Sequence, residues 1–208
     1  DVLQSDNQAI PEVRNWALGV LKQTLKEAGQ ALPEAAQKEL EKNPLPKSIS
    51  SLVVPKSDTA LEMFFEGYRA NFGPLTEEKI DNLRELFSHI SEDRDVQDVR
   101  YVAYILATIM HETGGTFATT TEICPNPLSR TCEEDDGNYR GRGYIQLSLR
   151  ANYQRFGALI GVDLAGSPEL ALQPKFAYEI TSILMIEGSG TGKKLSDYIN
   201  DSGTDYVG

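Results

Sequence analysis

The spacing of apolar residues along the chain predicts a protein built mainly of α-helices. Apolar positions recur every three or four residues in several segments, which places them on one face of a helix in each. Proline or acidic residues stand in the first turn of some segments and glycines follow the ends of others, as is typical of helix boundaries. The predicted helices cover residues 11–28, 33–42, 59–72, 77–90, 95–112, 149–161 and 174–187.

The helix predicted over 95–112 differs from the others because apolar residues surround most of its circumference. Val102, Ile105, Leu106 and Ile109 fall on more than one face, so we expect this helix to be the central one. It should end at Gly114-Gly115. Ser148 is expected to be the N-cap of the helix that follows the glycine-rich segment.

Two stretches lack helical periodicity. Residues 116–143 are dense in Thr, Pro, Asp, Glu and Gly, which predicts a long loop with a short β-hairpin. Loops of that length in compact domains are usually functional. The Asn-Pro-Leu-Pro run at 43–46 indicates a linker, so we divide the chain into a helical N-terminal arm, 1–55, and a main domain, 56–208. The arm contains Trp16 and either packs on the main domain, binds a partner protein, or serves as a delivery module for a larger phage or secretion assembly.

Composition and charge exclude several classes of function. The net charge is -11 and no basic cluster is present, so nucleic acid is not an expected partner. The longest nearly uncharged run, around residues 101–110, is much shorter than the roughly 20 residues that span a bilayer. We therefore expect no membrane span. A neutral or cationic partner suits this charge better.

The only two cysteines, Cys124 and Cys132, lie close together in the predicted loop. They either close a small disulfide loop in an oxidising compartment or remain two reduced thiols. A thiol hydrolase pairing one of them with His111 is a weaker alternative, because neither cysteine begins an evident helix that would lower the pKa of its thiol.

Two glutamates in unlike surroundings are the main candidates for chemistry. Glu112 follows Ile105 and Ile109 at helical spacing, so its carboxyl should share a face with core residues, where partial desolvation favours the protonated form. Glu122 lies among threonines in a polar segment, where a carboxylate stays ionised. This pair suits a general acid and a general base. The alternative is a solvated or salt-bridged residue at each position.

Metal and cofactor chemistry is not indicated by the sequence. The zinc pattern H-E-x-x-H fails after His111-Glu112 because position 115 is Gly. The P-loop spacing fails near Lys193 because position 187 is Glu rather than Gly, and no G-x-S-x-G nucleophile motif is present. We therefore expect no cofactor and no metal.

Several motifs, taken in order, resemble one known family. They are the helix Tyr104–Met110 running into His111-Glu112-Thr113-Gly114-Gly115, then Glu122, then Tyr139-Arg-Gly-Arg-Gly-Tyr-Ile-Gln-Leu-Ser148, then Asn152-Tyr153. Together they resemble the family 19 glycoside hydrolases, the chitinase and phage-endolysin group. The resemblance covers roughly residues 60–207 and implies a lysozyme-like α-helical catalytic domain with a long active-site loop.

The resemblance also implies roles for individual residues. Glu112 matches the proton donor, Glu122 the base, and Ser148 the hydroxyl that helps to hold the attacking water. The residues implied to bind the sugar are His111, Tyr144, Gln146, Ser148, Asn152 and Tyr153. Tyr144 stands where many members have Pro. Amide side chains suit N-acetyl groups, which offer both a donor and an acceptor.

From this resemblance we expect an inverting enzyme that cleaves β-1,4 bonds of peptidoglycan at the bacterial cell wall or outside the cell. No classical signal peptide precedes the domain, so delivery by phage lysis or a secretion system is expected. Chitin is the alternative substrate. The sequence after Lys194 resembles a run that leads into a further helix in relatives, so a catalytically silent sugar-binding or assembly protein is a third hypothesis.

Overall fold

The computed structural model describes residues 58–96, 98–123, 138–189, 192–200 and 203–204. The predicted N-terminal arm, the domain boundary near residue 55 and both cysteines lie outside these residues. No helix in the described part of the chain is long and apolar enough to cross a membrane.

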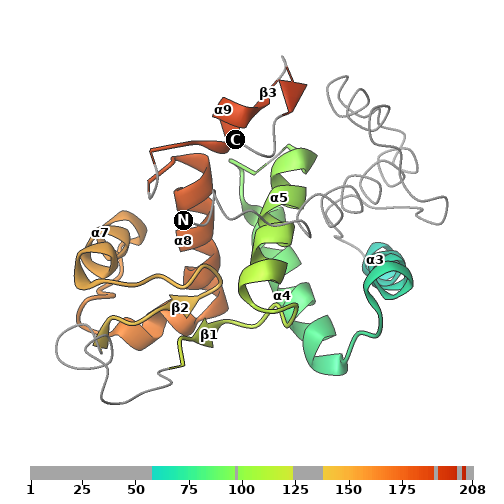
Figure 1. Cartoon of the computed structure of the whole chain (residues 1–208), viewed down its shortest axis with the longest axis horizontal. Helices are drawn as coiled ribbons and strands as arrows, with labels where there is room; N and C mark the ends of the chain where they lie inside the picture. Colours follow the sequence, from blue (N-terminus) through green and yellow to red (C-terminus); the bar gives the residue numbers. More distant parts are fainter. Residues whose placement is uncertain (1–57, 97, 124–137, 190–191, 201–202, 205–208) are drawn as a thin grey trace.

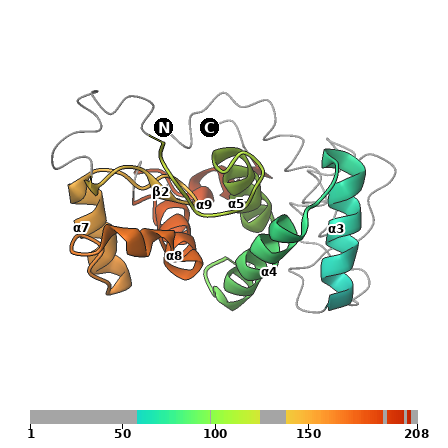
Figure 2. The ribbon, with the colours of Figure 1, turned by 90° about the horizontal axis from the view of Figure 1, so that it is seen from below.

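The described residues form a mainly helical fold, as the apolar spacing predicted (Figure 1). Helices α5 and α8 run side by side in the middle of the molecule, with α3 at one edge and α7 at the other, and the view from below shows the same order (Figure 2). The helices are α3 (Asp58–Phe72), α4 (Glu77–Glu92), α5 (Val99–Glu112), α7 (Arg150–Ile160), α8 (Pro174–Ile186) and α9 (Leu195–Tyr198), with a 3-10 helix η1 (Pro168–Leu172).

The local sequence explains where these helices begin. Thr76 caps α4, its hydroxyl accepting from the N–H of Lys79 at 3.3 Å. Helix α5 begins later than predicted, at Val99 rather than near Asp95, because the Asp98 carboxylate caps it and accepts from the N–H of Arg100 at 2.8 Å. Pro174 supplies the first turn of α8, where its missing N–H costs nothing.

The core lies where α5 and α8 meet their neighbours. All residues from Val102 to Ile109 are buried, which fits the prediction of a central helix. Helix α8 is equally central, since it packs against α4, α5, α7, α9, η1 and β2. Phe64, Phe65 and Phe87 join α3 to α4, with ring centroids 4.8 Å apart between Phe64 and Phe87. Burial of large side chains such as these is the main stabilising force.

Two small antiparallel ladders complete the fold. Strand β1 (Thr120–Thr121) pairs with β2 (Arg142–Gly143), with Thr120 opposite Gly143. This pairing is the short hairpin predicted for the long loop. Strand β3 (Ile199–Asn200) pairs with β4 (Gly203–Thr204) near the end of the described chain. The β1–β2 ladder lies between the C-terminal end of α5 and helix α7 (Figures 1 and 2).

Candidate active site

Helix α5 delivers Glu112 to the edge of the core. Ile109 and Ile105, one and two turns earlier, have no exposed surface, whereas Glu112 is half-buried and His111 is exposed. Glu112 therefore stands at the end of an apolar face. No hydrogen bond or ion pair within the described part of the chain engages its carboxylate.

The turn after Glu112 is held by a buried threonine. The Thr113 hydroxyl donates to the carbonyl of Ile109 at 2.7 Å and accepts from the N–H of Phe117 at 3.0 Å. Gly114 and Gly115 have φ of +59° and +74°, values that glycine adopts without a steric penalty. The N–H of Gly115 returns to the carbonyl of Met110 at 2.6 Å. These contacts stop α5 directly after Glu112 and turn the chain toward β1.

Helix α4 supports the same turn from the side. The Asn82 amide donates to the carbonyl of Thr116 at 3.2 Å. Phe117 is buried and packs edge-on against Tyr68, with ring centroids 5.9 Å apart. The segment between the two candidate glutamates is thus anchored to both α3 and α4.

Glu122 is fixed to the glycine-rich segment by a reciprocal pair of hydrogen bonds. Its backbone N–H donates to the carbonyl of Gly141 at 2.8 Å, and its Oε2 accepts from the N–H of Gly141 at 3.1 Å. Glu122 is exposed, as its polar surroundings predicted. The hydrogen bond orients a carboxylate that would otherwise rotate freely in solvent.

Gln146 joins the two strands of the ladder. Its amide nitrogen donates to the Thr120 hydroxyl at 2.9 Å, to the Thr120 carbonyl at 3.3 Å and to the Gly143 carbonyl at 3.1 Å. A Cβ on Gly141 would lie 2.8 Å from Oε1 of Gln146, so a larger residue there would displace this side chain. The amide therefore has a fixed orientation.

Ser148 and Asn152 lie together at the start of α7. The Asn152 amide donates to the Ser148 carbonyl at 2.8 Å. The prediction that Ser148 is the N-cap of this helix is wrong: the cap is Leu149, which has φ of +70° and makes no side-chain capping bond. The backbone there turns one residue later than predicted, and Ser148 is left half-buried.

The two predicted sugar-binding tyrosines lie beneath the surface. Tyr144 is 1% exposed and Tyr153 has no exposed area. The Tyr153 hydroxyl donates to the Arg140 carbonyl at 2.8 Å and accepts from Nη1 of Arg142 at 3.0 Å. Tyr153 therefore supports the glycine-rich segment, and direct contact of either buried ring with a sugar would require it to move.

Backbone strain is concentrated in the segments that carry these residues. Phe117, Gln146 and Leu149 are the non-glycine residues with positive φ in the part of the chain that the structure describes. Phe117 lies between the two glutamates, and the other two flank Ser148. Such conformations cost on the order of 1–3 kcal/mol each and tend to persist at functional sites. This distribution points to the same region as the motifs do.

Hydrogen bonds place some of the predicted residues in two small groups. One joins Glu122 and Gln146 to the Gly141–Gly143 segment, and the other joins Ser148 to Asn152. Within the described residues no hydrogen bond or ion pair joins the side chains of Glu112 and His111 to either group. No group of three or more His, Cys, Asp or Glu residues among those described could hold a metal ion.

Sequence reasoning did not identify three residues that hold the candidate site in place. Thr113 and Asn82 hold the turn after Glu112, and Gly141 holds Glu122. The signal for Gly141 was present, since Gly-Arg-Gly indicates close approach of the backbone to a neighbour. A threonine directly after a helix also indicates capping contacts. Nothing in the sequence indicated Asn82, because its partner lies 34 positions away.

Comparisons with known proteins bear on these motifs. No known family model matches the chain. A 71-residue segment is 42% identical to an endochitinase from Avena sativa, and it covers 34% of this chain and 32% of that enzyme. The chain therefore spans about a third of the relative that it matches.

Partial structural likenesses were found to two chitinase C structures. One, a chitinase C variant, covers 66% of this chain and 68% of that chain at 22% identity, with a TM-score of 0.38. The other, chitinase C from Streptomyces griseus HUT6037, covers 77% of this chain and 57% of that chain at 22% identity, with a TM-score of 0.34. The endochitinase match confirms, over the matched segment, the resemblance to chitinases that the motifs predicted.

Proposed function

We propose that this protein is a glycoside hydrolase that cleaves β-1,4 bonds in a polymer of N-acetylhexosamines. The observation that carries the proposal is the contrast between two glutamates joined by one anchored turn. Glu112 is half-buried at the end of an apolar helix, and Glu122 is exposed and oriented by the N–H of Gly141. Paired carboxyls in unlike environments are the machinery of glycoside hydrolysis.

The proposed reaction inverts the configuration at the anomeric carbon. Glu112 gives its proton to the glycosidic oxygen as the bond from that oxygen to C1 breaks. A water molecule attacks C1 from the opposite face, and Glu122 takes the proton that the water loses. One bond to C1 is broken and one is formed. Glu122 then releases its proton to solvent, and Glu112 takes one from solvent, before the next cycle. The Ser148 hydroxyl would hold the water.

The proposed sugar-binding wall uses amide groups with fixed orientation. The Gln146 nitrogen is occupied by Thr120 and Gly143, and the Asn152 nitrogen by Ser148. The carbonyl oxygens of both amides are then available to accept hydrogen bonds from hydroxyls or acetamido N–H groups. Acceptors held in place before binding lose little entropy when a sugar arrives.

We propose peptidoglycan as the natural polymer, with a bacteriolytic role. The support is the motif pattern, including Tyr144 at a position where many members of the family that the motifs resemble have Pro. Chitin is the second candidate, favoured by the match to the Avena sativa endochitinase. Both polymers present N-acetylhexosamine units in β-1,4 linkage, so the same acid and base would serve either.

Parallel assays would test this proposal. Purified full-length chain is incubated with peptidoglycan and with chitin, and reducing ends are counted, while proton NMR follows the anomeric signal of the first product. Release from peptidoglycan with the α-anomer appearing first is expected. Release of reducing ends from chitin alone would show that chitin is the substrate. A first product with the β configuration would show that the enzyme retains rather than inverts the configuration. Binding to either polymer without cleavage would favour a sugar-binding protein.

The place of action is also a proposal. A peptidoglycan hydrolase must reach the cell wall, so we propose that the protein acts there or outside the cell after phage lysis or secretion. Residues 1–55 are proposed to meet a protein partner in that delivery. Fractionation of the natural host should find the full chain outside the cytoplasm, and a purely cytoplasmic location would contradict the proposal.

A further inference from the structure

The carbonyl of Arg140 and the N–H of Gly141 belong to one peptide group, and both are engaged. The carbonyl accepts from the Tyr153 hydroxyl at 2.8 Å and from Nη1 of Arg142 at 3.4 Å. The N–H donates to Oε2 of Glu122 at 3.1 Å. This peptide bond is trans, so the group is planar and its carbonyl and N–H point to opposite sides. Holding the carbonyl on one side therefore fixes the direction of the N–H on the other.

Donor chemistry sets the direction of the hydrogen bonds around the Arg140 carbonyl. An arginine guanidinium donates but never accepts. Because the Tyr153 oxygen accepts from Nη1 of Arg142 at 3.0 Å, its single proton goes to the Arg140 carbonyl. Burial raises the pKa of the Tyr153 phenol, and this outweighs the lowering by the hydrogen bond from Arg142 and by the charges of Arg142 and Arg140. The hydroxyl therefore keeps this proton at neutral pH.

The Arg142 side chain starts from a fixed backbone. Its residue lies in the β1–β2 ladder, and its N–H and carbonyl both bond to Leu147, at 3.1 and 2.9 Å. The side chain turns back along its own segment, where Nη1 donates to the carbonyl of Asn138 at 2.8 Å. Nη1 carries two N–H groups, and the bonds to Asn138 and Tyr153 use both. The guanidinium thus closes the turn at residues 138–142.

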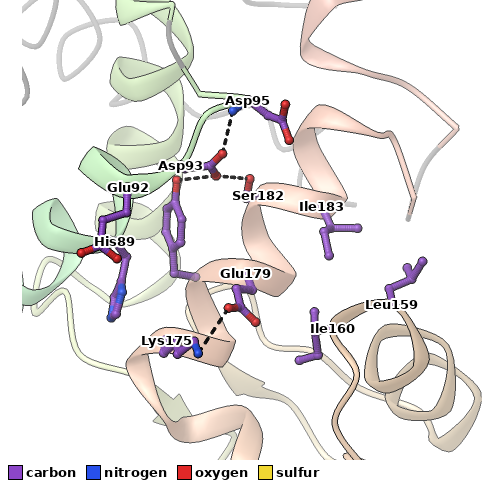
Figure 3. Close-up of a pocket in the computed structure, with 11 residues that line it drawn as sticks. His89, Glu92, Asp93, Asp95, Leu159, Ile160, Lys175, Glu179, Ser182 and Ile183 are labelled. Carbon is purple, nitrogen blue, oxygen red and sulfur yellow. Dashed lines mark hydrogen bonds and ion pairs between the residues drawn. The ribbon is translucent and has the colours of Figure 1, made fainter.

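Helix α7 holds Tyr153 in place from the other side. Tyr153 has no exposed area and lies with Phe156 on the buried face of α7. Its ring meets that of Tyr139 edge-on, with centroids 5.4 Å apart. The end of the same helix lies beside α8, where Ile160 and Ile183 line one pocket (Figure 3). The Tyr153 hydroxyl is therefore a donor with a fixed position.

We propose that Arg142 and Tyr153 are positioning residues for the proposed base. They hold the Arg140 carbonyl, and through the rigid peptide group they aim the N–H of Gly141 at the carboxylate of Glu122. Neither side chain needs to touch the sugar. The inference rests on the proposed function for the role of Glu122, but the contact itself can be measured without turnover.

The NMR signal of the Gly141 amide in the full, isotopically labelled chain tests the contact. A hydrogen bond to a carboxylate is stronger than one to a neutral carboxylic acid, so the Gly141 amide proton should shift when acid protonates Glu122. Glu122→Gln removes the carboxylate and should abolish this response. Tyr153→Phe keeps the buried ring and loses only the hydroxyl, and it should lose most of the response.

Tyr139→Phe is the matched control. The Tyr139 hydroxyl donates to the carbonyl of Ala165 at 2.9 Å, so this variant also loses one hydrogen bond of a buried tyrosine in the same ring pair. It leaves the peptide group between Arg140 and Gly141 untouched and should keep the response. An unchanged response in Tyr153→Phe, or an equal loss in both variants, would overturn the proposal.

Two arginine variants serve if Tyr153→Phe does not fold. Arg142→Met removes the half-buried guanidinium, whereas Arg140→Met removes an equal charge from an exposed side chain and leaves the backbone carbonyl in place. Only Arg142→Met should lose the Gly141 response. Equal effects in this pair would show a general influence of charge and would rule out the positioning role.

Kinetic measurements connect the contact to the reaction. A misdirected base slows the chemical step without weakening binding, so Tyr153→Phe should lower kcat about tenfold at unchanged KM, whereas Tyr139→Phe should change neither. An unchanged kcat in a Tyr153→Phe chain that has lost the Gly141 response would refute the positioning role. A wild type that cleaves neither polymer would instead overturn the proposed function, and the Gly141 signal would still decide the contact.

Discussion

The carboxylate of Glu122 and the backbone of Gly141 hold each other through two hydrogen bonds, one from the N–H of Glu122 to the carbonyl of Gly141 and one from the N–H of Gly141 back to Oε2. This pair joins a residue at the exit of β1 to the start of β2 across 19 positions of sequence. It turns a solvent-exposed glutamate into a group with a fixed direction. The proposed base therefore depends on a residue that carries no side chain.

Replacing Gly141 with alanine should disturb the Gln146 amide beside the proposed base. The new Cβ would lie 2.8 Å from Oε1 and 3.2 Å from Cβ of Gln146, so that side chain would have to shift, while Cβ of Glu122, at 3.4 Å, would be in ordinary contact. We expect a loss of about 1–3 kcal/mol in the free energy of unfolding, and a drop in kcat/KM of the order of 10²-fold. Denaturant unfolding and polymer hydrolysis measure the two effects.

Gly161→Ala is the matched control for that variant. Gly161 has φ of +71° and open space around its missing side chain, and it ends α7 away from the glutamates. The Gly161→Ala variant should lose about 1 kcal/mol in the free energy of unfolding and keep its activity. Equal loss of activity in the two variants would show that Gly141 acts only through general stability.

Thr113→Val should loosen the turn that follows Glu112. Valine keeps the shape of threonine but leaves the buried N–H of Phe117 without an acceptor, which costs about 1–3 kcal/mol. Thr108→Val is the comparison, because the Thr108 hydroxyl only donates to the Tyr104 carbonyl within the same helix. Thermal unfolding should show a clearly larger loss for Thr113, with reduced hydrolysis in that variant alone. Similar losses would refute the role given to the turn.

Leu149→Gly should stabilise the protein and weaken sugar binding. Leucine at φ of +70° is strained and its side chain is 56% exposed, so neither feature favours folding. Relief of strain, less the entropy cost of glycine, predicts a gain of about 1 kcal/mol in the free energy of unfolding. Because Leu149 adjoins Ser148, the KM for the polymer should rise. A variant that is less stable, or that has an unchanged KM, would contradict this account.

High pH should destabilise the fold through its buried tyrosines. Burial raises the pKa of Tyr144 above the ordinary value of 10.0, and the negative charge of Glu85 raises it further. Burial also raises the pKa of Tyr178, and the negative charge of Asp93 adds to that shift. In the unfolded chain these phenols ionise near pH 10, so above that pH the unfolded state binds fewer protons than the folded state. Their contribution to stability is complete below pH 10 and is lost as the pH rises.

Urea unfolding measured between pH 8 and pH 11 tests whether stability falls as the pH rises. The free energy of unfolding should fall over the upper part of this range, and Tyr144→Phe should make the fall shallower. If the free energy of unfolding falls with pH as steeply in the variant as in the wild type, Tyr144 does not contribute to the fall.

The sequence predicted the helices well because their apolar spacing records which face is buried. Helices α7 and α8 end near Gly161 and Glu187, next to the glycines at 161 and 188 that are stop signals in the sequence, and α4 runs two residues past its predicted end, to Glu92. The start of α5 was wrong by four positions because Asp95 and Asp98 are both acceptable caps, and only the contact with the N–H of Arg100 shows which one is used. Boundaries of this kind depend on single hydrogen bonds.

The site was predicted less completely, for reasons that concern long-range contacts. Exposure of Glu122 followed from its polar neighbours, but its bond to Gly141 depends on the pairing of β1 with β2. Tyr144 adjoins Gly143, and nothing local shows that its side chain is buried, whereas Tyr153 shares the buried face of α7 with Phe156. Nothing in the sequence indicates that Leu149 has a positive φ, because leucine rarely adopts such a conformation.

The central claim is that Glu112 donates the proton, and one comparison tests it most directly. Wild type, Glu112→Gln and Glu66→Gln, an exposed glutamate on α3, are assayed for reducing ends released from peptidoglycan and chitin, with unfolding curves to confirm that each is folded. A general acid contributes about 10²–10⁴-fold, so Glu112→Gln should lose at least that factor in kcat while Glu66→Gln retains full activity. A folded Glu112→Gln variant that cleaves either polymer at the wild-type rate would contradict the account.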